Sequence, residues 1–327
     1  MIAVEHAHRM AGRLGTAGLR IRWRRQIGDA LPLAALVGLT VWCIVLEPAV
    51  WSVNGMTILF QPAIPLVLAA VAQMFIIMLG DIDLGTGFFV GFVNAVVARY
   101  LTSSWLLVVG LLVAMVVGYA LSGALVQLRK IPAIIVTLGA SFIWLGFGLV
   151  VMPIPGGTSP QWLQSFMNWQ PAQFPAPLLF SIVIALVVWV ITFRLSIGSA
   201  FRGAGVNPEA LVRYGWSMLK LRVICYSLAA FFGILSGFAL TGITASGDPN
   251  ASAQYTLLAI AAVILGGGAF AGGRAVPFGV VIGALSMSLI GTLLALQNVA
   301  SSYQAGAQGL VLIIVLAGRA VTRRLEE

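Results

Sequence analysis

The chain has 327 residues, of which 60% are hydrophobic and only 8% charged, and its formal net charge is +9. A soluble domain carries about 25% charged residues, so this composition excludes a soluble globular fold and predicts an all-α, polytopic membrane protein surrounded by lipid. The basic residues lie at the ends of apolar segments. Membrane topology therefore accounts for the net charge, and no nucleic-acid partner is expected.

Three regions are expected along the chain. Residues 1–30 are an arginine-rich cytoplasmic tail, residues 31–318 are the transmembrane domain, and residues 319–327 are a second cytoplasmic tail. The apolar run after the first tail is interpreted as a retained span rather than a signal peptide, because no small-residue cleavage site follows Leu46.

Ten apolar segments approach the roughly 20 residues that a helix needs to cross a bilayer. They lie near 31–46, 57–79, 85–101, 105–128, 132–152, 178–193, 221–243, 256–272, 275–296 and 304–318. The first, sixth and last are short, so eight spans with re-entrant segments are the alternative to about ten spans.

The positive-inside rule predicts the orientation of these segments. With the N-terminus in the cytoplasm, the four longer outer loops contain no lysine or arginine; they are 47–56, 153–177, 244–255 and 297–303. Arg99, near an outer helix end, is the one exception. An N-in, C-in topology is therefore expected.

Two interruptions break the apolar pattern, at 78–85 and at 264–273. Each ends one apolar run and opens another, which suggests two pseudo-repeated halves, and paired broken spans often line a transport path. The glycines of the second interruption are expected to allow close helix packing; they are Gly266, Gly267, Gly268, Gly272 and Gly273.

Asp81 and Asp83 are the only acidic residues between Glu47 and Glu209. A carboxylate in the hydrocarbon core costs roughly 2.5–3.5 kcal/mol on insertion scales. Each aspartate is therefore expected to face a cavity, a partner group or a helix N-terminus. Three interpretations stay open: capping or orienting the helix that follows, lining a polar pathway, or lying in a solvated turn. Aromatic residues such as Phe88 and Trp144 can offer flat faces to a solute, or pack in the core or against lipid.

Residue usage argues against an enzyme. A phosphate-binding loop needs a lysine followed by serine or threonine, and neither Lys130 nor Lys220 is followed by one. The only histidines, His6 and His8, belong to the first tail. No catalytic residue, metal site or cofactor of its own is therefore expected in this chain.

The inner loop 194–220 contains a helix-start pattern. Asn207 can cap a helix, Pro208 suits its first position, and Glu209 suits its first turn. A short helix outside the lipid is predicted. From the spacing alone it either docks on a partner or rests on the membrane surface.

Four stretches, in order, resemble signatures of one family. They are 80–87 (GDIDLGTG), 131–139 (IPAIIVTLG), 205–210 (GVNPEA) and 259–268 with 272–274 (AIAAVILGGG and GGR). The family is the ribose-type sugar permeases of bacterial ABC importers, within a group that includes nucleoside and branched-chain amino-acid permeases. The similarity extends from about residue 57 to the C-terminus.

This resemblance implies a multi-pass permease subunit of the bacterial inner membrane, moving a monosaccharide or related polyol by alternating access. It implies three protein partners: a second permease copy, identical or not, a cytoplasmic ATPase that holds ATP and Mg²⁺, and a periplasmic substrate-binding protein. Import of a nucleoside or a sugar-like signal is the alternative, and a proton-coupled transporter using Asp81 and Asp83 is a third interpretation.

The substrate path is predicted to involve Asp81, Asp83, Gly85, Phe88, Asn94, Thr137 and Trp144. The resemblance implies a helix that couples to the ATPase, which is predicted to involve Arg202, Gly205, Asn207, Pro208, Glu209 and Arg213. Three departures stand out. Asp81 replaces a glycine of the family signature, and Thr256–Leu258 stands where many members carry an acidic pair. Phe88 and Phe89 follow the first signature where small residues are common.

Overall fold

The computed structural model describes residues 32–300, 303, 306–307, 309–310 and 313. Both predicted tails and most of the predicted last span lie outside the described residues. Apart from an isolated bridge between Gly156 and Gly247, the ordered elements of the described part are helical. They are the first helix Pro32–Leu46, η1 Pro48–Trp51, α2 Val53–Phe60, α3 Ala63–Met78, α4 Thr86–Tyr100, α5 Trp105–Arg129, α6 Ala133–Val151, α7 Gln161–Met167, α8 Ala176–Phe193, α9 Ser196–Val206, α10 Pro208–Arg213, α11 Met218–Thr244, α12 Tyr255–Leu265 and α13 Pro277–Leu296.

The helical membrane fold is confirmed, but about ten spans are not. Within the described residues, α5, α6, α8, α11 and α13 are long and apolar enough to cross a membrane, and α2 with α3, bent by 46°, makes a sixth. The predicted span 256–272 contains only α12, of 11 residues. At 1.5 Å per residue this helix covers about 17 Å, short of the roughly 30 Å hydrocarbon core.

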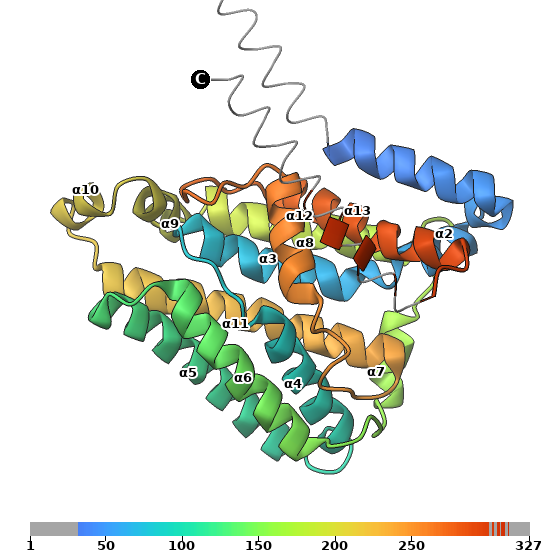
Figure 1. Cartoon of the computed structure of the whole chain (residues 1–327), viewed down its shortest axis with the longest axis horizontal. Helices are drawn as coiled ribbons and strands as arrows, with labels where there is room; N and C mark the ends of the chain where they lie inside the picture. The colour runs from blue at the N-terminus through green and yellow to red at the C-terminus, as the bar shows by residue number, and fades with distance from the viewer. Residues whose placement is uncertain (1–31, 301–302, 304–305, 308, 311–312, 314–327) are drawn as a thin grey trace, which may run out of the picture.

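Helix α3 is the centre of the molecule. All of its residues are buried, as expected of a helix that is apolar on every side. It packs against α11, α12 and α13, and Figure 1 shows α3 and α11 running lengthwise while α12 crosses them. The bend between α2 and α3 falls at Pro62, which cannot donate a backbone hydrogen bond.

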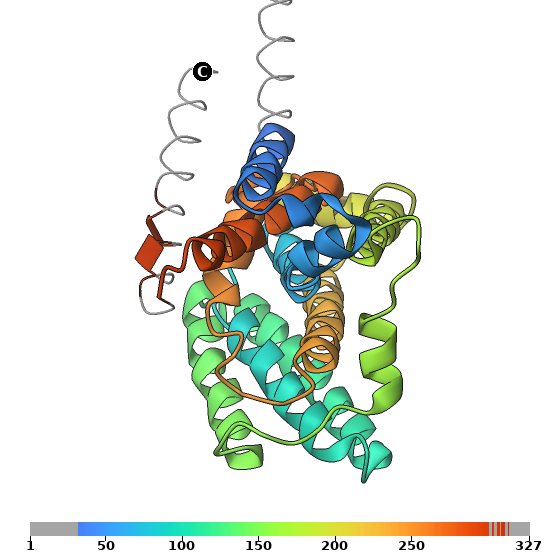
Figure 2. The same cartoon turned by 90° about the vertical axis from the view of Figure 1, so that its right-hand side faces the viewer.

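Helices α5 and α6 are much less buried than α3. Large apolar side chains such as Leu106 on α5 and Phe142 on α6 are exposed, which suits contact with lipid or with another apolar surface. Figure 2 shows α4, α5 and α6 gathered on one side of the molecule, with α12, α13 and the first helix on the other.

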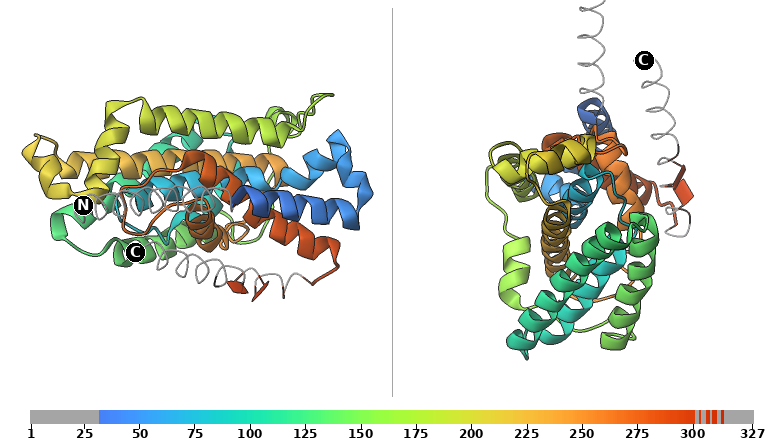
Figure 3. Two further views of the ribbon diagram at one scale, coloured as in Figure 1. Left: turned by 90° about the horizontal axis from the view of Figure 1, so that it is seen from above. Right: turned by 90° about the vertical axis from the view of Figure 1, so that its left-hand side faces the viewer.

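The two ends of the molecule differ. Helices α9 and α10 form one end, and α2 and α7 lie toward the opposite end (Figures 1 and 3). The helix predicted to begin at Pro208 is present as α10, and the side chain of Asn207 accepts a hydrogen bond from the Ala210 amide at 2.9 Å. No residue of α10 is buried, so this end projects from the bundle.

Candidate functional site

The first interruption begins where α3 ends in a left-handed residue. Gly80 has φ +81°, its amide donates to Ile77 O at 2.9 Å, and the Asp81 amide donates to Ile76 O at 3.3 Å. This pair of bonds is a Schellman motif, which requires a residue that tolerates positive φ. The glycine of the GDIDLG stretch therefore ends the helix and turns the chain.

The second interruption repeats this geometry at the end of α12. Gly267 has φ +104° and donates to Ile264 O at 3.1 Å, and the next amide, of Gly268, donates to Val263 O at 2.8 Å. In the two motifs, Gly267 therefore corresponds to Gly80, and Gly268 corresponds to Asp81. The repetition suggested by the sequence is thus present in the backbone at these two places.

Asp83 joins the start of α4 to α5. Its Oδ1 accepts from the Gly85 amide at 2.6 Å, and its Oδ2 accepts from Thr86 Oγ1 and from the Tyr119 hydroxyl, both at 2.7 Å. The residue is only 1% exposed. The solvated-turn interpretation is therefore wrong for Asp83, and its contacts are those of a residue that orients the following helix.

Two further side chains hold the backbone of this interruption. With its amide oriented to satisfy both groups, Gln73 of α3 donates to Asp83 O and accepts from the Asp83 amide, each at 3.2 Å. From α6, Thr137 Oγ1 accepts from the Leu84 amide at 3.0 Å and donates to Ile82 O at 3.1 Å. The predicted path residue Thr137 thus fixes the backbone between α3 and α4.

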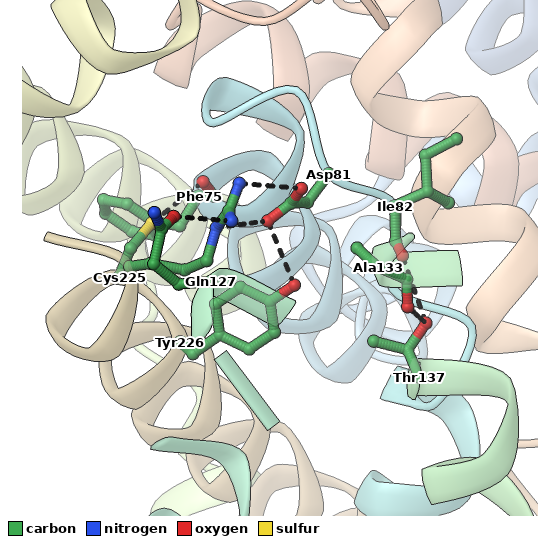
Figure 4. A network of polar contacts seen from close by, with 9 residues as sticks. Phe75, Asp81, Ile82, Gln127, Ala133, Thr137, Cys225 and Tyr226 are labelled. Carbon is green, nitrogen blue, oxygen red and sulfur yellow. Dashed lines mark hydrogen bonds and ion pairs between the residues drawn. The ribbon is translucent and has the colours of Figure 1, made fainter. Parts of the chain in front are cut away.

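Asp81 is paired rather than free. Its carboxylate faces Arg222 of α11, with Oδ2 3.0 Å from Nε and Oδ1 3.3 Å from Nη2 (Figure 4). The Tyr226 hydroxyl donates to Oδ2 at 3.2 Å, and Arg222 Nη1 donates to Oε1 of Gln127 on α5 at 2.8 Å. The extra charge that distinguishes this chain's first signature is therefore neutralised by α11.

An aromatic cluster adjoins the Asp83 group. The Trp144 ring of α6 stacks on Tyr119 and on Phe92, with centroids 5.9 and 6.1 Å apart, and meets Phe89 edge-on at 5.3 Å. Trp144 is 7% exposed, yet its indole N–H has no hydrogen-bond partner in the described part of the chain. Phe88, expected here, takes part in none of these ring pairs and is only partly buried.

Asn94 is not brought to this group. Its amide nitrogen donates to Thr241 Oγ1 at 2.9 Å and Ser246 O at 3.0 Å, and its oxygen accepts from the Asp248 amide at 2.7 Å. It fixes the connection after α11. Gly85 remains beside Asp83, where an added Cβ would lie 3.1 Å from the carboxylate.

The residues missed from the sequence are the partners of the two aspartates: Gln73, Tyr119, Gln127, Arg222 and Tyr226. The sequence does mark three of them, because Gln73, Gln127 and Arg222 are polar residues within or beside apolar runs. Such residues usually face a partner inside the bundle. Spacing along the chain could not say which carboxylate each would meet.

The loop at the α9–α10 end meets both interruptions at one point. The Gly273 amide donates to Met78 O at 2.8 Å, and a Cβ on Gly205 would overlap both of these atoms. An added Cβ on Gly272 would lie 2.8 Å from the amide nitrogen of Gly80. We call these five residues the glycine junction. The C-terminal end of α9 therefore lies directly against the start of the first interruption and the end of the second.

The other predicted residues either lie in tightly packed helix contacts or are exposed on the loop. Gly266 allows α12 to cross α13 closely, since its Cβ would overlap the Gly279 backbone, and a Cβ on Gly268 would lie 2.5 Å from a methyl of Val263. On α9, the Arg202 guanidinium lies 4.4 Å from the Phe193 ring centre. The remaining predicted loop residues are exposed: Asn207, Pro208, Glu209 and Arg213.

Substituting Gly205 by alanine should destabilise the protein, because the new methyl group has no room between Met78 and Gly273. Overpacking of this kind costs about 1–3 kcal/mol, so thermal unfolding in detergent should begin at a lower temperature. Gly139→Ala in α6 is the matched control, since nothing lies within 4 Å of its Cβ position. Equal unfolding temperatures for the two variants would contradict a tight junction.

Comparison with known proteins agrees with this architecture. Residues 55–316 match the family model described as branched-chain amino acid transport system / permease component. The chain is 30% identical to the ribose import permease protein of Bacillus subtilis over 87% of its own length and 90% of that protein. It is 27% identical to the D-allose transport system permease protein of Escherichia coli, covering 81% and 83% of the two chains.

A third relative is the autoinducer 2 import system permease protein of Salmonella choleraesuis, 26% identical over 88% of this chain and 84% of that one. No solved structure matches the chain. The family match covers most of the length, including both interruptions and the loop between α8 and α11. The chain therefore belongs to the branched-chain amino acid transport system permease family, among the inner-membrane permeases of sugar ABC importers, as its four signatures indicate.

Proposed function

We propose that this chain is the transmembrane subunit of an importer that moves a monosaccharide or related polyol by alternating access, driven by a separate ATPase. The observation that carries the proposal is the α9–α10 loop, in which α10 is not buried and the C-terminal end of α9 lies in the glycine junction against both interruptions. A force applied to this loop reaches the two broken segments directly. Switching between two arrangements of such segments is how alternating access works.

The surface of the loop suits docking into a protein groove. Val206, Val212 and Tyr214 are 75%, 53% and 82% exposed and lie close to the charged Glu209 and Arg213. Exposed apolar groups rimmed by charges favour a protein partner over bulk water. With the ATPase bound here, the α9–α10 end faces the cytoplasm and the α7 end faces the periplasmic binding protein, which gives the predicted orientation.

The path proposed for the solute runs beside Asp83, Gly85, Thr137 and Trp144. The second permease copy would complete it, and ATP and Mg²⁺ belong to the ATPase partner. Both aspartates are engaged by neighbouring side chains, which favours ATP-driven import over proton coupling through free carboxylates.

Import of a sugar-like signal is the second candidate, because one relative is named as an autoinducer 2 permease. The binding protein should set most of the selectivity. Uptake of labelled ribose by cells that produce all subunits, with allose, a nucleoside and autoinducer 2 as competitors, separates the candidates by which compound abolishes uptake.

Replacing Asn207, Pro208 and Glu209 together by alanine should prevent assembly with the ATPase, because the helix loses its cap and its first turn on the exposed face. A cap alone contributes about 1 kcal/mol to its helix. Co-purification of the ATPase and ribose uptake are the measurements. The control is Trp162→Ala, at an exposed position of α7 near the other end. Full co-purification of the ATPase with the triple variant would refute the coupling assignment.

A further inference from the structure

A polar hollow opens beside the Asp81–Arg222 ion pair. It has a volume of about 270 Å³, and its lining includes Asp81, Gln127, Lys130, Ala133 and Arg222. The ion pair forms part of its wall, with side-chain exposures of 10% for Asp81 and 16% for Arg222. The lining comes from the first interruption, the α5–α6 connection and α11, close to the end that carries α9 and α10.

The polar contacts at this hollow join three separate segments. Asp81 belongs to the interruption after α3, Gln127 to the last turn of α5, and Arg222 to the beginning of α11. Arg222 binds both of the others through its guanidinium. Separation of Arg222 from Asp81 would therefore leave the Tyr226 hydroxyl as the remaining side-chain contact from α11 to Asp81.

Both partners of the ion pair are attached to the α9–α10 loop. Asp81 follows Gly80, which the glycine junction places against Gly272 and near Gly205 at the C-terminal end of α9. Arg222 lies in the second turn of α11, the helix into which the loop leads after its cap at Ser217. A movement of the loop is therefore transmitted to both charged groups.

The backbone does not require a side chain at position 81. The matching motif at the end of α12 has Gly268 at the equivalent place and forms the same two hydrogen bonds. The turn is thus complete without a carboxylate, and a partly buried charge is costly unless it is paired. The presence of Asp81, together with Arg222 opposite it, points to a role for the side chains themselves.

We propose that the hollow is the exit subsite of the transport path, taking a small uncharged polyhydroxylated solute, and that the Asp81–Arg222 pair in its wall is the latch that keeps it narrow. This inference rests on the proposed function. When the α9–α10 loop moves, the pair opens, and the carboxylate, guanidinium and Gln127 amide become available to solute hydroxyl groups.

The chemistry of the lining fits such a solute. A hydroxyl group both donates and accepts, so it can replace either partner of the ion pair. Pockets for drug-sized ligands occupy about 300–1,000 Å³, and this hollow is slightly smaller, which suits a single sugar unit. An anionic solute is less suited, because Asp81 neutralises Arg222 and leaves Lys130 as the one unpaired cation among the described lining residues.

The latch is tested by access to the hollow. Ala133→Cys, at a buried lining position, is introduced into a chain whose buried Cys43 and Cys225 are replaced by alanine and serine. In inside-out vesicles, a membrane-impermeant maleimide should label this cysteine slowly when the pair is intact. Arg222→Gln or Asp81→Asn should increase the labelling rate severalfold, and the exchanged pair Asp81→Arg with Arg222→Asp should return it toward the original rate.

Arg129→Gln is the matched control. Arg129 lies exposed in the last turn of α5, and its side chain has no ion pair in the described part of the chain. It should leave the labelling rate unchanged. If Arg222→Gln fails to insert in the membrane, Asp81→Asn supplies the same comparison. Equal labelling of the latch variants and Arg129→Gln would overturn the latch.

The exit subsite has its own measurement. Ribose added at the cytoplasmic side of Ala133→Cys vesicles that keep both Asp81 and Arg222 should slow the labelling further, whereas ribose 5-phosphate at equal concentration should slow it less. No protection by ribose, or stronger protection by the phosphate, would overturn the subsite for an uncharged solute. Labelling needs no ATPase. If the unaltered complex shows no uptake of ribose or of the competing compounds, that result would instead refute the proposed function.

Discussion

Asp83→Ala is expected to prevent accumulation of folded protein. The Asp83 carboxylate accepts from the Gly85 amide, Thr86 Oγ1 and the Tyr119 hydroxyl at 2.6–2.7 Å in a fully buried position. Hydrogen bonds to charged groups contribute about 1.5–3 kcal/mol each, and stranded buried donors add their desolvation. Three such bonds together contribute about 4.5–9 kcal/mol before desolvation, which is comparable with the about 5–15 kcal/mol stability of a whole domain.

The measurement is the yield of monodisperse protein in detergent and its unfolding temperature. Asp83→Asn should be milder, because the amide keeps one acceptor oxygen and gains a donor toward Tyr119. Tyr119→Phe, alone and together with Asp83→Ala, completes a double-mutant cycle, and strong non-additivity is expected for groups in contact.

Asp248→Ala is the matched control for Asp83→Ala, since the Asp248 carboxylate accepts from the Asn250 amide in an exposed contact. It should lower stability by less than about 1 kcal/mol, as surface substitutions do. Similar yields for the two alanine variants would show that the Asp83 network does not hold α4 and α5 together.

The places where the chain leaves the helical path were predictable because their causes are local. Gly80 and Gly267 are needed for positive φ, and Asn207 with Pro208 starts α10. These features depend on residues within one or two turns of each other. The helical membrane character followed equally directly from composition. The sequence also placed Asp83 before the helix it orients.

What could not be predicted depends on contacts between distant segments. The apolar run 256–272 has the composition of a span, yet its helix ends at Leu265 because Gly267 provides the helix stop. Likewise, the sequence leaves the partner of Asp81 open, because Arg222 is brought opposite it only by the packing of α11 on α3. Asn94 is predicted on the same path as the aspartates, and the structure places it at a different connection, the one after α11.

The second large loss of stability is expected for substitution of Trp144, because this residue is the centre of the aromatic cluster. Trp144→Ala removes its stacking on Tyr119 and Phe92 and leaves a cavity, for which aromatic-to-alanine changes cost about 3–5 kcal/mol. The unfolding temperature in detergent should fall accordingly. Phe147→Ala, whose half-exposed ring contacts the cluster only at Phe92, is the control and should cost less.

The more informative change is Trp144→Phe, because it keeps an aromatic ring and deletes only the unpartnered N–H and part of the ring system. A buried donor without an acceptor is unfavourable by about 1–3 kcal/mol, so its removal offsets the loss of contact area and stability should change little. If the N–H meets a solute hydroxyl during transport, the KM for ribose uptake should rise up to about tenfold, equivalent to 1.4 kcal/mol. Trp162→Phe on α7 should alter neither quantity. A lower unfolding temperature with an unchanged KM would assign Trp144 to packing alone, whereas a raised KM at constant stability places it on the solute path beside Asp83.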